Sequence, residues 1–338
     1  MRITTGSSYW IKCMDNYLLD LLICNVPGLR GEDKIALAEI YTRAYDFLIL
    51  TKADIEYILG RKMKCRPWSM ADVCKKAETD AELALKRGIH MVSWREKSYP
   101  PLLREIFDPP LLLFYRGALP DPEKPIAAIV GTRKPTPQCA ERAFTLGREL
   151  GEAGIPVVSG LALGIDAMAH RGNIEGRAAT IAVLGSGVDM VFPSSNRELA
   201  RAILNKGGAL LSEYPPGTGP DKWHFPARNR IISALARGVV IVEAPLKSGA
   251  LITAQFALDQ NRDLWVDAEG AKSKRGEGSA RLAEEGAKLI FSAGDILAEW
   301  NIEKNVKILK RKGKREDAEQ NSGAALASSM ADYLDINL

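Results

Sequence analysis

Two arginines, an amide and a lysine stand close together in the second half of the chain and could bind a phosphate. Arg228, Asn229 and Arg230 open a segment with a helical pattern, and Lys222 lies shortly before them in the sequence. Guanidinium and ammonium groups together favour an anionic ligand, and phosphate fits their donor geometry. Apolar runs typical of buried strands flank this segment, so the sequence predicts a ligand crevice at the carboxyl ends of an open α/β sheet.

Small and polar residues follow almost every apolar run from residue 126 onward. Glycine lets a backbone approach a phosphate closely, and free N–H groups at a helix start carry partial positive charge toward it. One such cluster is weak evidence for a binding site, but several clusters on successive strand ends favour one. The clusters contain Gly131, Thr132 and Arg133; Ser159, Gly160, Gly164 and Asp166; Gly185 to Gly187; Ser212 to Tyr214; and Glu243 with Ser248 and Gly249.

The elements that must position these clusters alternate between strand and helix. Apolar strands this uniform predict a mostly parallel sheet that helices cover on both faces, joined by right-handed crossovers. Strands are expected at 126–130, 155–158, 180–184, 209–211, 239–243 and 264–266, and helices at 138–153, 164–175, 195–206, 227–237, 249–260 and 294–300.

Composition divides the chain into four parts. Residues 1–80 carry helical patterns, and the Pro-Gly turn at 26–31 resembles hairpins that bind a nucleic-acid backbone, although a plain helix connector is favoured. Residues 81–125 form a proline- and aromatic-rich bridge, in which the run at 111–115 is expected to be an edge strand because prolines flank it. Residues 126–302 hold the α/β pattern, and 303–338 form a basic, low-complexity tail.

Bulk composition excludes several classes of protein. The net charge of +4 is too small to indicate a nucleic-acid binder by itself, so basic character must lie in local patches. The 5 cysteines show no CxxC spacing, which disfavours a disulfide frame or a zinc site and fits a reducing cytoplasm. No apolar run is long enough to span a membrane, and the polar amino terminus does not look like a signal peptide.

Several catalytic signatures are missing from the sequence. There is no GxxxxGK[ST] phosphate loop, no GxGxxG after the first strand and no GxSxG elbow. Asp166 and His170 stand four residues apart on one expected helix and could pair or hold a metal. Capping and bracing of the helix start is favoured, because no third ligand has a suitable spacing. We therefore expect no catalytic residues, no metal and no cofactor.

Four long motifs carry a resemblance to a known family. The chain is similar to the DNA-processing protein A family (DprA, also called Smf) over about residues 95–300, in the segments 131–133, 159–166, 225–233 and 242–254. The resemblance implies an extended Rossmann-like, doubly wound α/β domain behind a small helical domain of sterile-alpha-motif type. It also implies binding of single-stranded DNA, a homodimer, loading of a RecA-type recombinase in natural transformation, and no enzymatic activity.

The resemblance also assigns residues. Arg133, Lys222 and Phe225 match the family's strand-contacting positions. Arg133 and Lys222 would neutralise phosphates, and Phe225 would stack on a base, which contributes ~1–3 kcal/mol. From the residues alone, a core aromatic is the plainer interpretation of Phe225.

Arg228 and Arg230 leave two interpretations open. At helical spacing, one would face the DNA while the other pairs with Glu243 inside the crevice. We expect the remaining strand-end residues to line the DNA site as well, with two pocket carboxylates. These residues are Gly131, Thr132, Ser159, Gly160, Gly164, Asn229, Ser248 and Gly249, with the carboxylates Asp166 and Glu243.

Two features depart from the family pattern. After its last strong strand the family has a Pro-Gly turn and then a Gly-Ser/Thr-Asn motif, whereas this chain has Val266 to Gly270 and Gly278 to Ala280. The missing Pro and Asn leave open whether this loop closes the pocket. The residues after 303 are too few and too polar for the winged-helix domain that ends many relatives.

Three functions are compatible with these observations. The favoured one is a non-enzymatic mediator that binds single-stranded DNA, protects incoming DNA and loads a recombinase. The second is an enzyme of the nucleoside monophosphate phosphoribohydrolase type, in which Glu243, Ser248, Gly249 and Thr253 hold a nucleotide. The third is a scaffold with a vestigial crevice. The segment Lys222 to Phe225 favours the first, because a strand groove uses an aromatic and basic segment and a nucleotide hydrolase does not.

Overall fold

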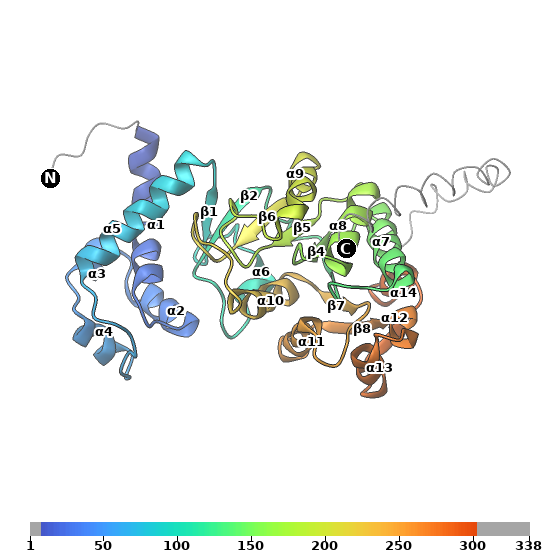
Figure 1. Cartoon of the computed structure of the whole chain (residues 1–338). Helices are drawn as coiled ribbons and strands as arrows, with labels where there is room; N and C mark the ends of the chain where they lie inside the picture. The colour runs from blue at the N-terminus through green and yellow to red at the C-terminus, as the bar shows by residue number, and fades with distance from the viewer. Residues whose placement is uncertain (1–7, 303–338) are drawn as a thin grey trace. The chain divides into compact units, whose positions relative to one another are not determined.

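A computed structural model describes residues 8–302 of the chain, with side chains from residue 16 onward (Figure 1). The tail expected at 303–338 lies outside the described residues. Two compact units are distinguished, divided after Ala293, and α14 (Ala293–Glu299) begins at this division. The domain boundaries expected at 80, 125 and 302 stay predictions.

Helices occupy the described residues up to 86, as the apolar patterns predict. Thr51 and Ser69 cap α4 and α5, each accepting the N–H of an aspartate three residues later, which stabilises a helix start. Leu37, Phe47 and Ile55 are fully buried and form part of the core. The helices are α1 (Ser8–Asn25), α2 (Gly31–Ile40), α3 (Ala44–Leu48), α4 (Lys52–Ile58) and α5 (Met70–Lys86).

A nine-stranded sheet follows, in the order β1-β2-β6-β5-β4-β3-β7-β8-β9. The pairs β1/β2 and β2/β6 are antiparallel and all others are parallel, which confirms the mostly parallel α/β sheet. The strands are β1 (His90–Ser93), β2 (Leu112–Gly117), β3 (Ala127–Val130), β4 (Val157–Ser159), β5 (Ile181–Val183), β6 (Ala209–Ser212), β7 (Gly238–Ile241), β8 (Asp263–Asp267) and β9 (Lys288–Ile290).

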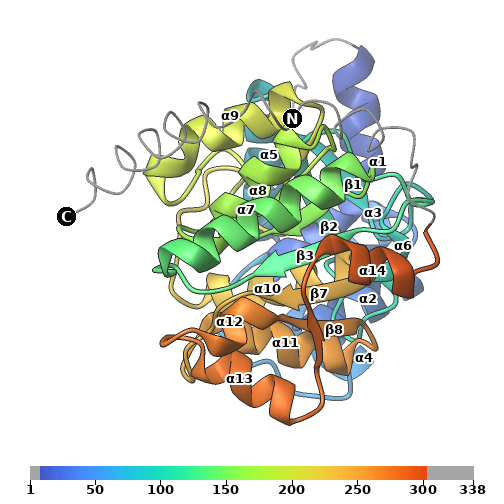
Figure 2. The ribbon, with the colours of Figure 1, turned by 90° about the vertical axis from the view of Figure 1, so that its right-hand side faces the viewer.

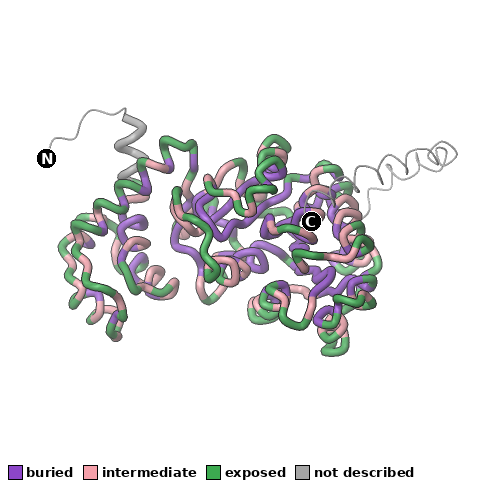
Figure 3. Tube along the Cα trace, in the orientation of Figure 1, coloured by how far each residue is buried: buried purple, intermediate pink, exposed green. Residues whose placement is uncertain are grey.

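The edge-strand prediction for residues 111–115 was wrong. β2 lies between β1 and β6, because the unexpected strand β1 covers its outer side. The prolines at 109 and 110 do not prevent this pairing, since the ladder begins only where Leu112 faces Ser93. β3 to β7 are buried along their whole length (Figure 3), which explains why their sequences are continuous apolar runs.

Helices connect the parallel strands. Right-handed crossovers place the helices that connect β3 to β6 on one face of the sheet and those that connect β6 to β8 on the other. Figure 2 shows α7 and α8 side by side; glycines allow this, since a Cβ at Gly172 would lie 1.9 Å from the Phe144 carbonyl oxygen. The helices are α6 (Pro101–Arg104), α7 (Pro137–Glu152), α8 (Ile165–Glu175), α9 (Arg197–Asn205), α10 (His224–Leu235), α11 (Gly249–Asp259), α12 (Ala268–Lys272) and α13 (Glu277–Glu284).

Candidate functional site

The carboxyl ends of the parallel strands bring the predicted polar clusters to one edge of the sheet. Strand order reverses direction at β3, which has β4 on one side and β7 on the other. Ligands of open α/β sheets bind outside the strand ends at such a point. Here the loop after β3 is tied to the end of β7, since the Thr132 N–H donates to the Glu243 carbonyl oxygen at 2.7 Å.

Arg133 and Phe225 meet at this edge. Arg133 is exposed in the loop after β3, and its guanidinium carbon lies 5.5 Å from the centroid of the Phe225 ring. Phe225 lies in the first turn of α10 and is half-buried. Its ring also packs on Gly185, where a Cβ would lie 3.0 Å from Phe225 Cδ1. The glycine after β5 therefore makes room for the ring at the surface.

Further aromatic rings extend this surface. Trp223 is 71% exposed, and the Lys222 Nζ lies 5.0 Å from its ring centroid. Phe192, which is 44% exposed, lies with its ring centroid 5.6 Å from that of Phe225. Sequence reasoning missed Phe192, although an aromatic residue beside a proline in the loop after a strand is a signal that could have indicated it. Two cation–aromatic pairs and one more ring thus line the edge.

The start of α10 is held against the loop after β5. The rings of Tyr214 and His224 stack with centroids 3.9 Å apart. The His224 Nδ1 lies 3.2 Å from the Gly185 carbonyl oxygen. These contacts fix the turn that carries Trp223 and Phe225, so the aromatic surface is positioned before any ligand binds.

Arg228 points into the protein and is 4% exposed. Its Nη1 donates to the Gly160 carbonyl oxygen at 2.8 Å and to the Val183 carbonyl oxygen, which joins α10 to the ends of β4 and β5. Burial lowers the pKa of Arg228 to about 10, against the opposite effect of the Asp166 carboxylate. Its guanidinium is therefore used inside the fold.

Asp166 faces the same buried position from α8. It accepts hydrogen bonds from the N–H groups of Gly160 at 3.1 Å and Ala162 at 3.4 Å, and burial raises its pKa. Gly160 stands between the two charged groups, since a Cβ there would lie 2.5 Å from Arg228 Nη2 and 2.8 Å from Asp166 Oδ2. Bracing of the loop before α8 is thus the observed role of Asp166.

Arg230 is also largely buried, and its partners correct one expectation. It donates to both Glu213 carboxylate oxygens, at 2.8 and 2.7 Å, and its Nε lies 3.1 Å from Asp108 Oδ2. Burial opposes the charge of Arg230, but Glu213 and Asp108 raise its pKa above the usual value. The expected pairing of Arg228 or Arg230 with Glu243 was wrong, because Glu213 follows β6 beside α10 and Asp108 approaches from the bridge segment.

Glu243 is fully buried and has other partners. Its carboxylate accepts from the Thr136 N–H at 2.8 Å, from the Thr136 hydroxyl at 3.2 Å and from the Ser273 hydroxyl. These bonds join the end of β7 to the start of α7 and to the segment after α12. Glu243 therefore links the loops around the point where strand order reverses.

The other predicted residues shape the edge through their backbone or through short contacts. Asn229 Nδ2 donates to the Gly249 carbonyl oxygen at 3.2 Å, and Ser248 caps α11. The buried Ser159 hydroxyl donates to the Ile129 carbonyl oxygen at 2.6 Å.

Gly164 has φ +76, and a Cβ there would lie 2.5 Å from the Thr132 carbonyl oxygen. A Cβ at Gly131 would clash with Ile165 at 2.6 Å. Direct DNA contact by these residues stays a prediction.

The loop at 266–280 is anchored without the family's Pro and Asn. Asp267 caps α12 and pairs with Arg142 at 2.7 Å. The Ala244 N–H donates to the Ser279 hydroxyl at 2.9 Å, and the Gly278 N–H donates to the Ala244 carbonyl oxygen at 2.8 Å. The loop thus packs on the end of β7.

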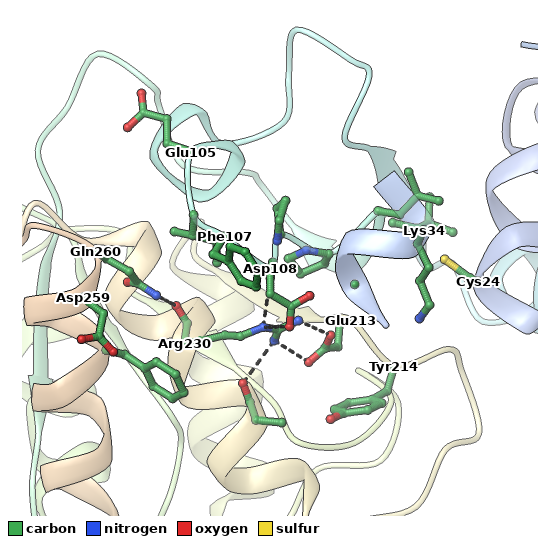
Figure 4. Close-up of a pocket in the computed structure, with 18 of the residues that line it drawn as sticks. Cys24, Lys34, Glu105, Phe107, Asp108, Glu213, Tyr214, Arg230, Asp259 and Gln260 are labelled. Atoms are coloured by element: carbon green, nitrogen blue, oxygen red, sulfur yellow. Dashed lines mark hydrogen bonds and ion pairs between the residues drawn. The ribbon is translucent and has the colours of Figure 1, made fainter. Parts of the chain in front are cut away.

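A cavity of about 740 Å³ lies elsewhere, around Arg230 (Figure 4). Asp108, Glu213, Tyr214 and Gln260 line it, and Arg230 lies between the first two. Arg133, Lys222 and Phe225 do not belong to its lining, so this cavity is separate from the aromatic edge.

The described residues contain neither a metal-binding cluster nor a membrane-spanning helix. Within that part of the chain, no three His, Cys, Asp or Glu side chains are placed to hold a metal ion. His170 is buried and its Nδ1 lies 2.7 Å from the Thr180 hydroxyl rather than facing Asp166.

No helix between residues 8 and 302 is long and apolar enough to cross a membrane.

Comparison with known proteins identifies the family. Residues 90–301 match DNA recombination-mediator protein A. The chain belongs to this family. Protein Smf of Synechocystis is 43% identical over 248 residues, which cover 72% of this chain and 60% of that protein. The chain therefore spans less than two thirds of that relative.

Solved structures of the family share the fold. The X-ray structure of DNA processing protein A from Streptococcus pneumoniae matches with a TM-score of 0.69 and 35% identity, over 88% of this chain and 99% of that one. The Helicobacter pylori protein, whose structure is described as showing a single-stranded DNA binding mode, matches with a TM-score of 0.55 and 31% identity, over 63% and 95%. These matches confirm the predicted family and its doubly wound α/β fold.

Proposed function

We propose that this chain binds single-stranded DNA along the carboxyl edge of its sheet and acts as a recombination mediator in natural transformation. The observation that carries this proposal is the placement of the exposed Arg133 guanidinium over the Phe225 ring. A cation beside an aromatic face can hold a phosphate while the ring stacks on the adjoining base.

The surface favours a single strand over a duplex. Bases in a duplex are stacked on one another and hide their faces, whereas an unpaired strand offers both bases and phosphates. Trp223 and Phe192 expose additional ring surface, and Lys222 supplies a second cation. The single-stranded DNA binding described for the Helicobacter pylori relative supports the same chemistry here.

Membership of the family supports a proposal for the wider role. We propose that the chain protects incoming DNA and loads a RecA-type recombinase in the cytoplasm, as a homodimer without enzymatic turnover, metal or cofactor. The carboxyl-terminal half of the sheet region supports the dimer. Leu258 and Ile252 on α11 are 55% and 40% exposed, and Leu251 and Phe256 on the same helix are partly exposed.

The alternative nucleotide hydrolase is not favoured by the geometry. Both oxygens of Glu243 accept hydrogen bonds from Thr136 or Ser273, so the carboxylate is not free to hold a ribose. Thr253 is buried, and its hydroxyl lies 3.5 Å from the Gly249 carbonyl oxygen within α11.

A binding comparison tests the proposal. Fluorescence anisotropy would measure the affinity of the full chain for single-stranded and duplex oligonucleotides of equal length, at low and high salt. We expect tighter binding of the single strand and weaker binding at high salt, because phosphate contacts release counterions. Equal affinity for both forms, or cleavage of nucleoside monophosphates by the pure protein, would contradict it.

A further inference from the structure

Two basic loops lie next to each other beside the Arg133–Phe225 pair. Arg133 and Lys134 belong to the loop after β3. Lys272 ends α12, and Lys274 and Arg275 belong to the turn between α12 and α13, in the part of the chain that departs from the family pattern. All five side chains belong to exposed residues.

Specific hydrogen bonds hold the second loop against the first. The Arg275 Nη1 donates to the Lys134 carbonyl oxygen at 2.9 Å. The Ser273 hydroxyl donates to the buried Glu243, which also accepts from the Thr136 N–H at 2.8 Å. The basic turn is thus fixed from both sides to the segment that follows β3, rather than attached only through its own ends.

The positive charges in these loops are not neutralised by the protein. Within residues 16–302, none of the five cations forms an ion pair with a carboxylate, although Glu269 and Glu277 flank the turn in the sequence. Like charges held close together repel, and an anion that lies across both loops would relieve this repulsion.

We propose that Lys272, Lys274 and Arg275 bind the DNA backbone beyond Arg133. This rests on the proposed function and extends it, because it gives the strand a path. The strand would run from Lys222 and Phe225 past Arg133 and onto the α12–α13 turn. It would therefore cross the point where strand order reverses, and the site would hold more phosphates than the family-matched residues alone can reach.

A double variant tests the path. Lys272→Ala/Lys274→Ala removes two unpaired charges and keeps Arg275, whose guanidinium holds the Lys134 carbonyl oxygen. The matched control is Lys75→Ala/Lys206→Ala, which removes two exposed charges from α5 and from the end of α9. Lys206 precedes β6 and so lies at the opposite, amino edge of the sheet. Arg133→Ala is measured in the same assay, and thermal unfolding checks that all variants fold.

The salt dependence of binding to a long oligothymidine distinguishes the outcomes. Each lost phosphate contact lowers the log–log slope by about 0.7, so Lys272→Ala/Lys274→Ala should lower the slope by about 1.4. The control variant should keep the slope of the wild type. If the double variant behaves like the control while Arg133→Ala weakens binding, the path is wrong and the proposed function stands. If Arg133→Ala and the double variant both leave binding unchanged, both proposals fail.

Discussion

Arg133 lies over the ring of Phe225, with its guanidinium carbon 5.5 Å from the ring centroid. The first residue follows β3 and the second begins α10, which is the crossover between β6 and β7. Gly185, after β5, leaves room for the Cδ1 edge of the ring. Three strand ends therefore cooperate to expose one cation and one aromatic ring together.

Replacement of Phe225 by leucine should weaken DNA binding without changing its salt dependence. Leucine fills the space against Gly185 but offers no ring, so the loss should be about 1–3 kcal/mol for one base stack. Affinity measured at several salt concentrations checks this. Phe107→Leu, at a ring that is 84% exposed and lines the separate cavity, is the control. A smaller salt slope for Phe225→Leu would mean that a phosphate contact was lost instead.

Arg228→Met should destabilise the fold. Its guanidinium donates to the carbonyl oxygens of Gly160 and Val183, and each buried carbonyl left without a donor costs about 1–3 kcal/mol. Denaturant unfolding would show the loss, whereas Arg133→Met at the exposed edge should leave the free energy of unfolding nearly unchanged. Unchanged stability of Arg228→Met together with lost DNA binding would instead make Arg228 a direct DNA contact.

His170 should make the protein less stable in acid. Burial, with smaller effects of Arg228 and Arg171, lowers its pKa from 6.5 to about 3. Between these values the unfolded chain binds a proton that the folded protein does not. The neutral form therefore supports full stability above pH 6.5, and this contribution is lost as the pH falls toward 3.

The comparison with His170→Asn measures this effect. From about pH 6 to pH 4, the free energy of unfolding of the wild type should fall more steeply than that of the variant, by about 1.4 kcal/mol per pH unit. Burial raises the pKa of Asp166, so protonation of this carboxyl favours the folded state as the pH falls. Asp166 is present in both proteins, so its effect does not change the comparison. Parallel curves for the two proteins would show that folding does not lower the pKa of His170.

Much of the fold could be predicted from local patterns. The runs at 126–130 and 239–242 are apolar throughout because β3 and β7 are buried on both faces, and such runs are recognisable in the sequence. β1 was missed because His90 and Met91 remain partly or fully exposed and the strand has only four residues. Its pairing with β2 depends on residues far apart in the sequence, which no local pattern reveals.

The sequence indicated which residues belong to the candidate site, but not which partners their side chains bind. Arg228 and Arg230 were recognised as unusual, but their burial depends on Val183, Asp108 and Glu213, which only the folded chain brings near. Glu243 was expected to pair with an arginine, yet Thr136 and Ser273 bind it. Hydrogen bonds between distant loops decide such roles, and their partners leave no spacing signal in the sequence.

The salt dependence of single-stranded DNA binding by Arg133→Ala and Lys222→Ala tests the central claim most directly. Both side chains are exposed, so neither substitution should alter thermal stability. We predict that each variant binds an oligonucleotide more weakly and lowers the log–log salt slope by about 0.7, as expected for one lost phosphate contact. Wild-type affinity and slope in both variants, with the fold intact, would place the DNA away from the carboxyl edge and contradict the account.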